Sequence, residues 1–172
     1  MLDRLRATAT GWALRRARHT SGTRAARWYT RAVRWTPRFS HGHEALVHLL
    51  LARGDREGAL ATAQQAVHRF ATNPDAWVLL GKGYEGMFRT RDALISYEQA
   101  LTFEERPDAA MAAGRLYRQM GDPVNAGARF ARAYAAGAGP EALKANAEML
   151  RKAGDDAAAD DAERRWRAEC GA

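Results

Sequence analysis

The sequence has few of the features that mark secreted, metal-binding or membrane-spanning proteins. Its 172 residues include one cysteine, Cys170, which excludes an internal disulfide and fits no metal-binding motif. No apolar run approaches the roughly 20 residues that a membrane-spanning helix needs. The first residues also lack the apolar core of a signal peptide. We therefore expect a protein without a transmembrane helix, in a reducing, cytoplasmic compartment.

Lysine is scarce as well, since only Lys82, Lys144 and Lys152 contribute to the 27 basic residues. Together with abundant alanine, this preference for arginine indicates a GC-rich, bacterial genome. The net charge of +7 is unevenly distributed: residues 1–40 contain ten arginines and one acidic residue, Asp3, whereas residues 41–172 contain 17 basic and 19 acidic residues. The first quarter of the chain is therefore the candidate for contact with an anionic partner.

An internal repeat of 33 or 34 residues organises the chain, with three sets of positions recurring in five copies. The sets are Ala25, Ala59, Ala93, Ala126 and Ala159; Tyr29, Ala63, Tyr97, Phe130 and Glu163; and Ala32, Ala66, Ala100, Ala133 and Trp166. Within each copy the three positions are spaced by four and then three residues, which places them on one face of a helix. The small side chains on that face predict helices that approach each other closely.

The residues that break helices follow the same period. Glycine followed by aspartate recurs at Gly54, Gly121 and Gly154, where glycine suits the left-handed end of one helix and aspartate the start of the next. Proline recurs at Pro74, Pro107 and Pro140, where a first-turn proline is tolerated. No run alternates as a strand would. The pattern predicts an all-α fold of antiparallel helix pairs.

The stretch from Pro74 to Leu101 resembles a tetratricopeptide repeat (TPR). The residues that carry the resemblance are Trp77, Leu80, Gly81, Tyr84, Ala93, Tyr97 and Ala100, and the unit at 107–139 matches through Gly114, Tyr117, Gly121, Ala126, Phe130 and Ala133. The resemblance implies a right-handed solenoid of about five units. We expect an Arg-rich, degenerate N-terminal repeat at 1–39, three TPR-like repeats at 40–139 and a degenerate, capping C-terminal repeat at 140–172.

The resemblance also implies a concave groove, lined by the first helix of each pair, that binds segments of partner proteins. The positions mapped to this groove include His41, Glu44, His48, Asp75, Glu148 and Lys152. The candidate contacts for a partner among the mapped positions are Lys82, Glu85, Arg115, Arg118, Lys144 and Arg151. Its basic C-terminal half suits an acidic peptide or a carboxylate terminus. The alternative is an ordinary solvated face of mixed charge. The asparagine positions of the chaperone-binding TPR clamp are not matched, because Asn125 and Asn146 stand elsewhere.

A stripe of arginines is the strongest local feature of the sequence. The stripe consists of Arg24, Arg27, Arg31, Arg34 and Arg38, with Trp28 and Trp35 at its border. Such a helix suits an anionic membrane surface, with arginine at the headgroups and tryptophan at the interface. An acidic face of a protein complex would suit it too, and the alternative is a solvated cap whose tryptophans pack on the next repeat. We do not expect a nucleic acid, because no base-reading motif accompanies the stripe.

Catalysis finds no support in the sequence. His41, His43 and His48 are spaced by two and five residues, which fits no zinc motif, and we expect neither metal nor cofactor. The sequence therefore predicts a non-enzymatic protein-interaction scaffold or adaptor, an accessory subunit or assembly factor at the inner face of a membrane or on a membrane-bound complex. The alternatives are a homo-oligomeric scaffold, in which the basic helix binds acidic patches of another copy, and a nucleic-acid-associated protein.

Overall fold

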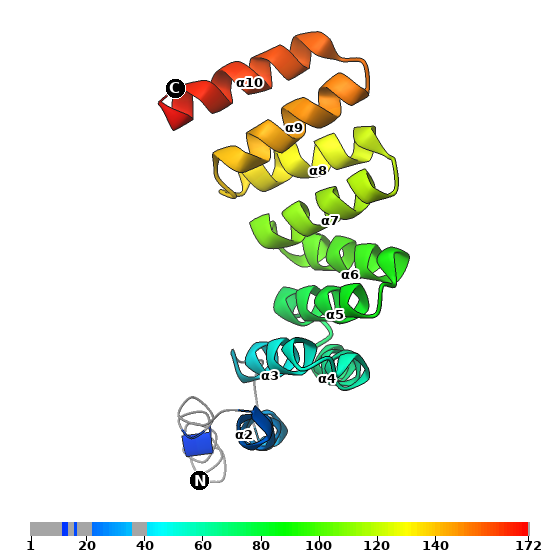
Figure 1. The fold of residues 1–172 in the computed structure, drawn as a ribbon, viewed down its shortest axis with the longest axis vertical. Coiled ribbons are helices and arrows are strands. Elements are labelled where there is room, and N and C mark those ends of the chain that lie inside the picture. The colour runs from blue at the N-terminus through cyan, green and yellow to red at the C-terminus, as the bar shows by residue number, and fades with distance from the viewer. Residues whose placement is uncertain (1–11, 14–15, 17–21, 36–40, 172) are drawn as a thin grey trace. The chain divides into compact units, whose positions relative to one another are not determined.

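A computed structural model describes residues 12–13, 16, 22–35 and 41–171 of the chain. In these residues helices and turns are present, without a strand (Figure 1). The helices are α2 (Gly22–Trp35), α3 (His41–Ala52), α4 (Arg56–Arg69), α5 (Pro74–Gly86), α6 (Thr90–Phe103), α7 (Pro107–Gln119), α8 (Pro123–Ala135), α9 (Pro140–Lys152) and α10 (Asp156–Cys170). None of these helices is long and apolar enough to cross a membrane.

The chain divides into two compact units, Met1–Arg89 and Thr90–Ala172. In the first unit α2 packs on α3, and α4 packs against both α3 and α5. In the second unit each helix from α6 to α10 packs against the next one. The break between the units falls inside the repeat at 74–106, between its two helices. The predicted division into an N-terminal cap, three repeats and a C-terminal cap stays a prediction, as does the right-handed twist of the whole array.

The small residues of the repeat lie where the period places them. Every member of the two alanine series that lies in a second helix, from Ala25 to Ala159 and from Ala32 to Ala133, is at most 4% exposed. Two of the three aromatic residues between them are buried as well, with Tyr97 and Phe130 each 1% exposed, whereas Tyr29 is partly exposed. Burial of this face supplies the apolar contact that stabilises short helices, which are marginal on their own. The all-α fold of helix pairs is confirmed.

The turn between the two helices of a repeat is built in the same way three times. Gly54, Gly121 and Gly154 have left-handed φ angles of +78°, +77° and +86°. The aspartate after each glycine caps the following helix, because its carboxylate accepts a hydrogen bond from the backbone N–H three residues on. The bonded atoms are 2.9, 3.0 and 3.1 Å apart for Asp55, Asp122 and Asp155. The predicted glycine ends and aspartate caps are both confirmed.

In the repeat at 74–106 this turn departs from the pattern. Phe88 stands at the position of Gly54, Gly121 and Gly154, and its φ of +58° is the one left-handed angle of a non-glycine residue in the part of the chain that the structure describes. Its side chain is 75% exposed. The sequence pattern did not single out this residue, although the 34-residue step from Gly54 leads directly to it.

Candidate functional site

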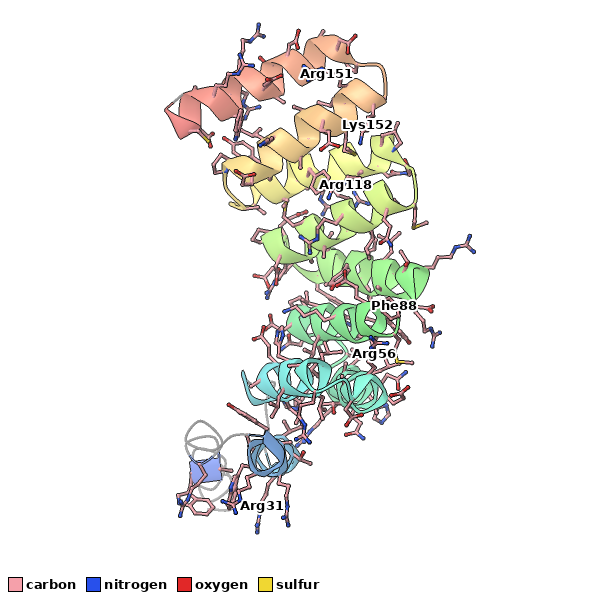
Figure 2. All side chains as sticks on the ribbon, in the orientation of Figure 1. Arg31, Arg56, Phe88, Arg118, Arg151 and Lys152 are labelled. Atoms are coloured by element: carbon pink, nitrogen blue, oxygen red, sulfur yellow. The ribbon has the colours of Figure 1, made fainter. Side chains whose placement is uncertain are left out.

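Helix α2 presents two chemically opposite faces. Ala25 and Ala32 are 4% and 0% exposed, and α2 packs on α3. Arg24, Arg27 and Arg31 are exposed, and Figure 2 shows Arg31 extending from α2 on the side away from α3. Because arginines spaced by three and four residues share one side of a helix, the three guanidinium groups lie together on the solvent face.

A hollow of about 410 Å³ lies beside this face, and its lining includes Arg24, Arg27, Trp28 and Arg31 among the described residues. No acidic residue occurs at the described positions before residue 41. Neither Arg24 nor Arg27 has an ion pair with a carboxylate of the described residues. The hollow is therefore a concentrated site of positive charge beside an aromatic ring.

Stacked aromatic and guanidinium groups connect this hollow to the segment before α2. The rings of Trp12 and Trp28 meet edge to face, with centroids 4.9 Å apart. The guanidinium carbon of Arg16 lies 5.7 Å from the centre of the Trp12 ring, and that of Arg31 lies 5.9 Å from the centre of the Trp28 ring. A stacked guanidinium uses its flat face, so stacking itself leaves the in-plane N–H donors to other acceptors. Through these contacts, the guanidinium groups of Arg16 and Arg31 are held beside the partly exposed rings of Trp12 and Trp28.

The remainder of the predicted stripe is not described by the structure. Arg38 lies outside the described residues. Arg34 and Trp35 belong to α2, but their side chains lie outside what the structure describes. The arginine stripe is thus placed on one face of α2 through Arg24, Arg27 and Arg31.

In the first unit, the residues mapped to the groove come together on adjacent first helices. The Nζ of Lys82 on α5 lies 3.3 Å from Oε1 of Glu44 on α3 and 3.4 Å from Nε2 of His48. Glu85, one turn after Lys82 on α5, is half-buried. The contacts show that α3 and α5 share one polar surface, and that the charge of Lys82 is matched on it.

In the second unit, carboxylates from neighbouring helices match most of the predicted basic groove. Arg118 on α7 lies 3.8 Å from Glu148 on α9, and the Nζ of Lys152 lies 2.7 Å from the other oxygen of Glu148. The hydrogen bond from Lys152 lowers the pKa of Glu148, against a smaller rise from burial. Arg115 is exposed and has no ion pair with a described carboxylate. This surface is of mixed charge, with Arg115 as an available cation.

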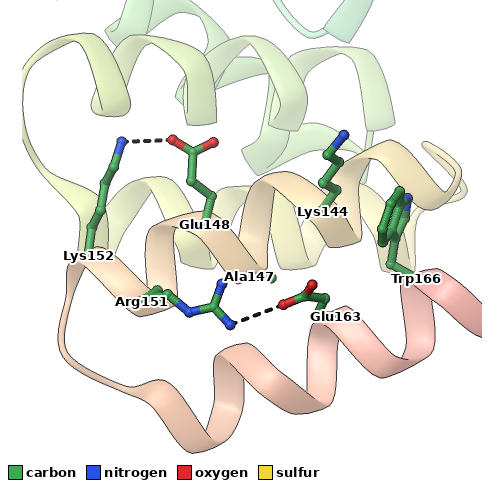
Figure 3. A pocket seen from close by; sticks show the side chains of 7 residues that line it. All are labelled: Lys144, Ala147, Glu148, Arg151, Lys152, Glu163 and Trp166. Carbon is green, nitrogen blue, oxygen red and sulfur yellow. Dashed lines mark hydrogen bonds and ion pairs between the residues drawn. The ribbon is translucent and has the colours of Figure 1, made fainter.

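Helices α9 and α10 enclose a hollow of about 390 Å³, whose lining includes the predicted residues Lys144 and Arg151 (Figure 3). Arg151 donates hydrogen bonds to Asp160 at 2.9 Å and to Glu163 at 3.0 Å. The Nζ of Lys144 lies 5.0 Å from the centre of the Trp166 ring. Two carboxylates thus match the charge of Arg151, whereas Lys144 covers an aromatic ring.

This hollow occupies the place where another repeat would continue the array. In repeat register Glu163 corresponds to Phe130 and Asp160 corresponds to Gly127. In α8 these two positions face α9: Phe130 packs with Met149, and a Cβ at Gly127 would lie 3.4 Å from the Cβ of Met149. The corresponding face of α10 therefore carries charge where α8 carries an apolar contact.

The two described histidines of the 41–48 segment, His43 and His48, lie in different surroundings. His43 is 2% exposed and meets Phe70 edge to face at 5.6 Å, while His48 lies by Glu44 on the solvent side. The side chain of His41 is not described. Among the residues that the structure places, no three His, Cys, Asp or Glu side chains converge as metal ligands would.

Comparison with family models found no match, and comparison with curated proteins found none. Several solved structures are similar. The crystal structure of MamA gives a TM-score of 0.74 at 16% identity, covering 94% of this chain and 91% of that chain. A thermophilic TPR protein from Thermus thermophilus gives 0.63 at 20% identity, covering 98% and 89%. PilF from Pseudomonas aeruginosa gives 0.75 at 17% identity, covering 98% and 78%.

These likenesses extend over nearly the whole chain at low sequence identity, so they concern the fold. The resemblance to tetratricopeptide repeats is confirmed at that level: the chain has the TPR fold, an all-α solenoid of helix pairs.

Proposed function

We propose that this chain is a non-enzymatic scaffold that docks on an anionic membrane surface through the solvent face of α2. The observation that supports docking is the hollow formed by Arg24, Arg27 and Arg31 beside Trp28. Guanidinium groups bind phosphate-bearing headgroups, and tryptophan favours the boundary between headgroups and acyl chains. Each basic residue near an anionic leaflet contributes about 1 kcal/mol, so three act together as a useful but reversible anchor.

The scaffold part of the proposal rests on the fold. Stacked helix pairs present extended surfaces on which segments of partner proteins bind. The shared surface of α3 and α5 at Glu44 and Lys82, and that of α7 and α9 at Arg118 and Glu148, are the candidates for this contact. Arg115 is the cation there that an acidic segment would meet. A protein of this kind serves as an accessory subunit or assembly factor of a membrane-bound complex, on its cytoplasmic side in a bacterium.

Flotation with liposomes tests the docking directly. The full chain is mixed with vesicles of phosphatidylcholine alone or with increasing phosphatidylglycerol, at low and high salt. We expect flotation that rises with the anionic lipid and falls with salt. A variant with Arg24, Arg27 and Arg31→Glu should lose it.

The matched control places the same three charge reversals at exposed arginines outside α2, namely Arg53, Arg91 and Arg115→Glu. This control should float like the unmodified chain, because its three arginines lie outside α2. That result would show that a change in net charge alone does not abolish binding. Equal flotation of the two triple variants would overturn the proposed role of α2. Sedimentation of both variants distinguishes the alternative: a change of oligomeric state without a change in flotation would assign the arginines to contacts between copies.

A further inference from the structure

Phe88 combines two unfavourable features at a position where the chain uses glycine three times. Its backbone is left-handed, at φ +58°, where the Cβ of an L-residue is crowded by its own carbonyl. Its ring is 75% exposed to water. At the corresponding Gly54, Gly121 and Gly154, an added Cβ would meet nothing within 4 Å, so the turn itself needs no side chain there. Strained backbone of this kind clusters at ligand-binding and other functional sites.

The ring does not support the apolar core of the first unit. Its sequence neighbour Met87 and the nearby Tyr84 pack against the buried cluster around Leu79 and Ala63, whereas Phe88 is not among the residues in that cluster. Replacing Phe88 by glycine therefore removes no core contact.

One cation is fixed on the ring. The guanidinium carbon of Arg56, in the first turn of α4, lies 4.7 Å from the centre of the Phe88 ring. Both residues are labelled in Figure 2. Arg56 is exposed and has no ion pair with a carboxylate of the described chain. The neighbouring Asp55 carboxylate is already used, because it accepts the capping hydrogen bond from the Gly58 N–H. Stacking holds one face of the guanidinium and leaves its N–H edge able to bind a carboxylate.

We infer that Phe88 and Arg56 form a docking site for an acidic segment of a partner protein. A carboxylate of the segment binds the N–H edge of Arg56, and an adjacent apolar side chain packs on the open face of the Phe88 ring. The next residue in the chain, Arg89, stacks on a different ring, with its guanidinium carbon 4.8 Å from the centre of Tyr84. Binding would bury the exposed ring, and the favourable free energy of this burial would stabilise the complex.

A protein segment fits this site better than the membrane proposed for α2. Figure 2 shows Arg31 extending from α2 on the side away from α3, whereas Arg56 begins α4 and Phe88 lies just after the end of α5. A flat surface on which α2 lies therefore does not also reach Phe88. The site is independent of the proposed docking through α2, and it gives the chain a second point of contact.

The first experiment asks whether the ring serves the fold. Phe88→Gly should leave the urea midpoint of unfolding unchanged or raise it, since glycine adopts the left-handed angle without steric cost. A lower midpoint would show that the ring stabilises the fold, and it would overturn the inference.

The second experiment asks whether the ring and Arg56 bind an acidic segment. A phage-displayed library of random dodecapeptides is selected on the full chain, with counter-selection on Phe88→Gly. We expect enrichment of peptides in which Asp or Glu adjoins a large apolar residue. Fluorescence anisotropy of such a peptide should show binding weakened by about tenfold or more in Phe88→Gly and in Arg56→Glu. The controls Ile95→Ala and Arg91→Glu change an exposed apolar residue and an exposed cation elsewhere, and should bind normally.

Three results would overturn the inference: no enrichment that depends on Phe88, enrichment of peptides without acidic residues, or equal binding by all variants. Flotation of Phe88→Gly on phosphatidylglycerol vesicles should match that of the unmodified chain. Loss of flotation in this variant would make Phe88 a membrane anchor instead. The outcome for the arginines of α2 is measured separately, so failure of one proposal does not decide the other.

Discussion

Substitution of Gly114 by alanine tests how closely the two helices of a repeat approach. Gly114 lies in the middle of α7 and faces α8. A Cβ built on it would lie 2.7 Å from Cε1, 2.8 Å from Cδ1 and 3.1 Å from Cζ of Phe130. Carbon atoms at optimal contact are about 3.5–4.0 Å apart, so the ring or the helix must move. The ring has little room to move, because Phe130 is 1% exposed and packs with Ala126 and Met149.

Two opposing effects set the size of the change in stability. In an unobstructed helix interior, alanine is more favourable than glycine by about 1 kcal/mol. Overpacking a well-filled core costs about 1–3 kcal/mol, and a contact as short as that between the added Cβ and Phe130 belongs at the upper end of this range. We therefore expect Gly114→Ala to lower the free energy of unfolding by about 1–2 kcal/mol.

Urea unfolding followed by far-ultraviolet circular dichroism measures this change. Phe130→Leu removes the aromatic ring that obstructs the new methyl group. By itself this substitution leaves a cavity beside Gly114 and lowers stability. The double variant should therefore be about 1 kcal/mol more stable than the sum of the two single effects predicts. Gly114→Ala that is more stable than the unmodified chain, or single effects that simply add, would refute the close approach of α7 and α8 at this point.

Three further substitutions test local contacts by the same urea assay. Arg129→Met should lower the free energy of unfolding by about 1 kcal/mol, because it leaves the half-buried Glu98, now bonded to Arg129 at 2.6 Å, without its donor. Gly121→Ala should lower the free energy of unfolding by about 1 kcal/mol, because alanine is strained at the left-handed φ of +77°. At Phe88 the substitution runs the other way, from a strained residue to glycine, and should not lower stability. Asp122→Ala should lower the urea midpoint at neutral pH and reduce its pH dependence. Hydrogen bonds from Asn125 lower the pKa of Asp122, so its contribution is present above the ordinary carboxyl pKa and is lost as the pH falls through the lowered value.

Most of the fold could be predicted from the repeat period, because the period is visible in the spacing of residues in the sequence. Ala126 and Phe130 are predicted to be buried because they recur at 33- and 34-residue steps, and Gly121 is predicted to end a helix for the same reason. Phe88 could not be predicted to end a helix, because a phenylalanine carries no turn signal of its own. Only the backbone angle shows that it adopts the conformation of glycine.

The candidate surfaces were less accessible to sequence reasoning. The exposure of Arg24 and Arg27 follows from their spacing on a single helix. The pairing of Arg118 with Glu148 does not, because it depends on how far α7 lies from α9 and on which rotamers meet. A count of charges along first helices therefore overstated the positive character of the second unit. The stack of Arg16, Trp12 and Trp28 likewise joins residues whose approach no periodicity specifies.

The charged face of α10 also bears on whether copies of the chain can form a filament. Growth by stacking would lay a helix of the next copy on α10 as α9 lies on α8. Asp160, Glu163 and Arg151 would then leave water together, and the desolvation of buried ion pairs often exceeds their mutual attraction. Stacking at this end is thus opposed by electrostatics, even though the helix pairs themselves are built to stack. An open, head-to-tail series of copies is discouraged, and any association between them must use another surface.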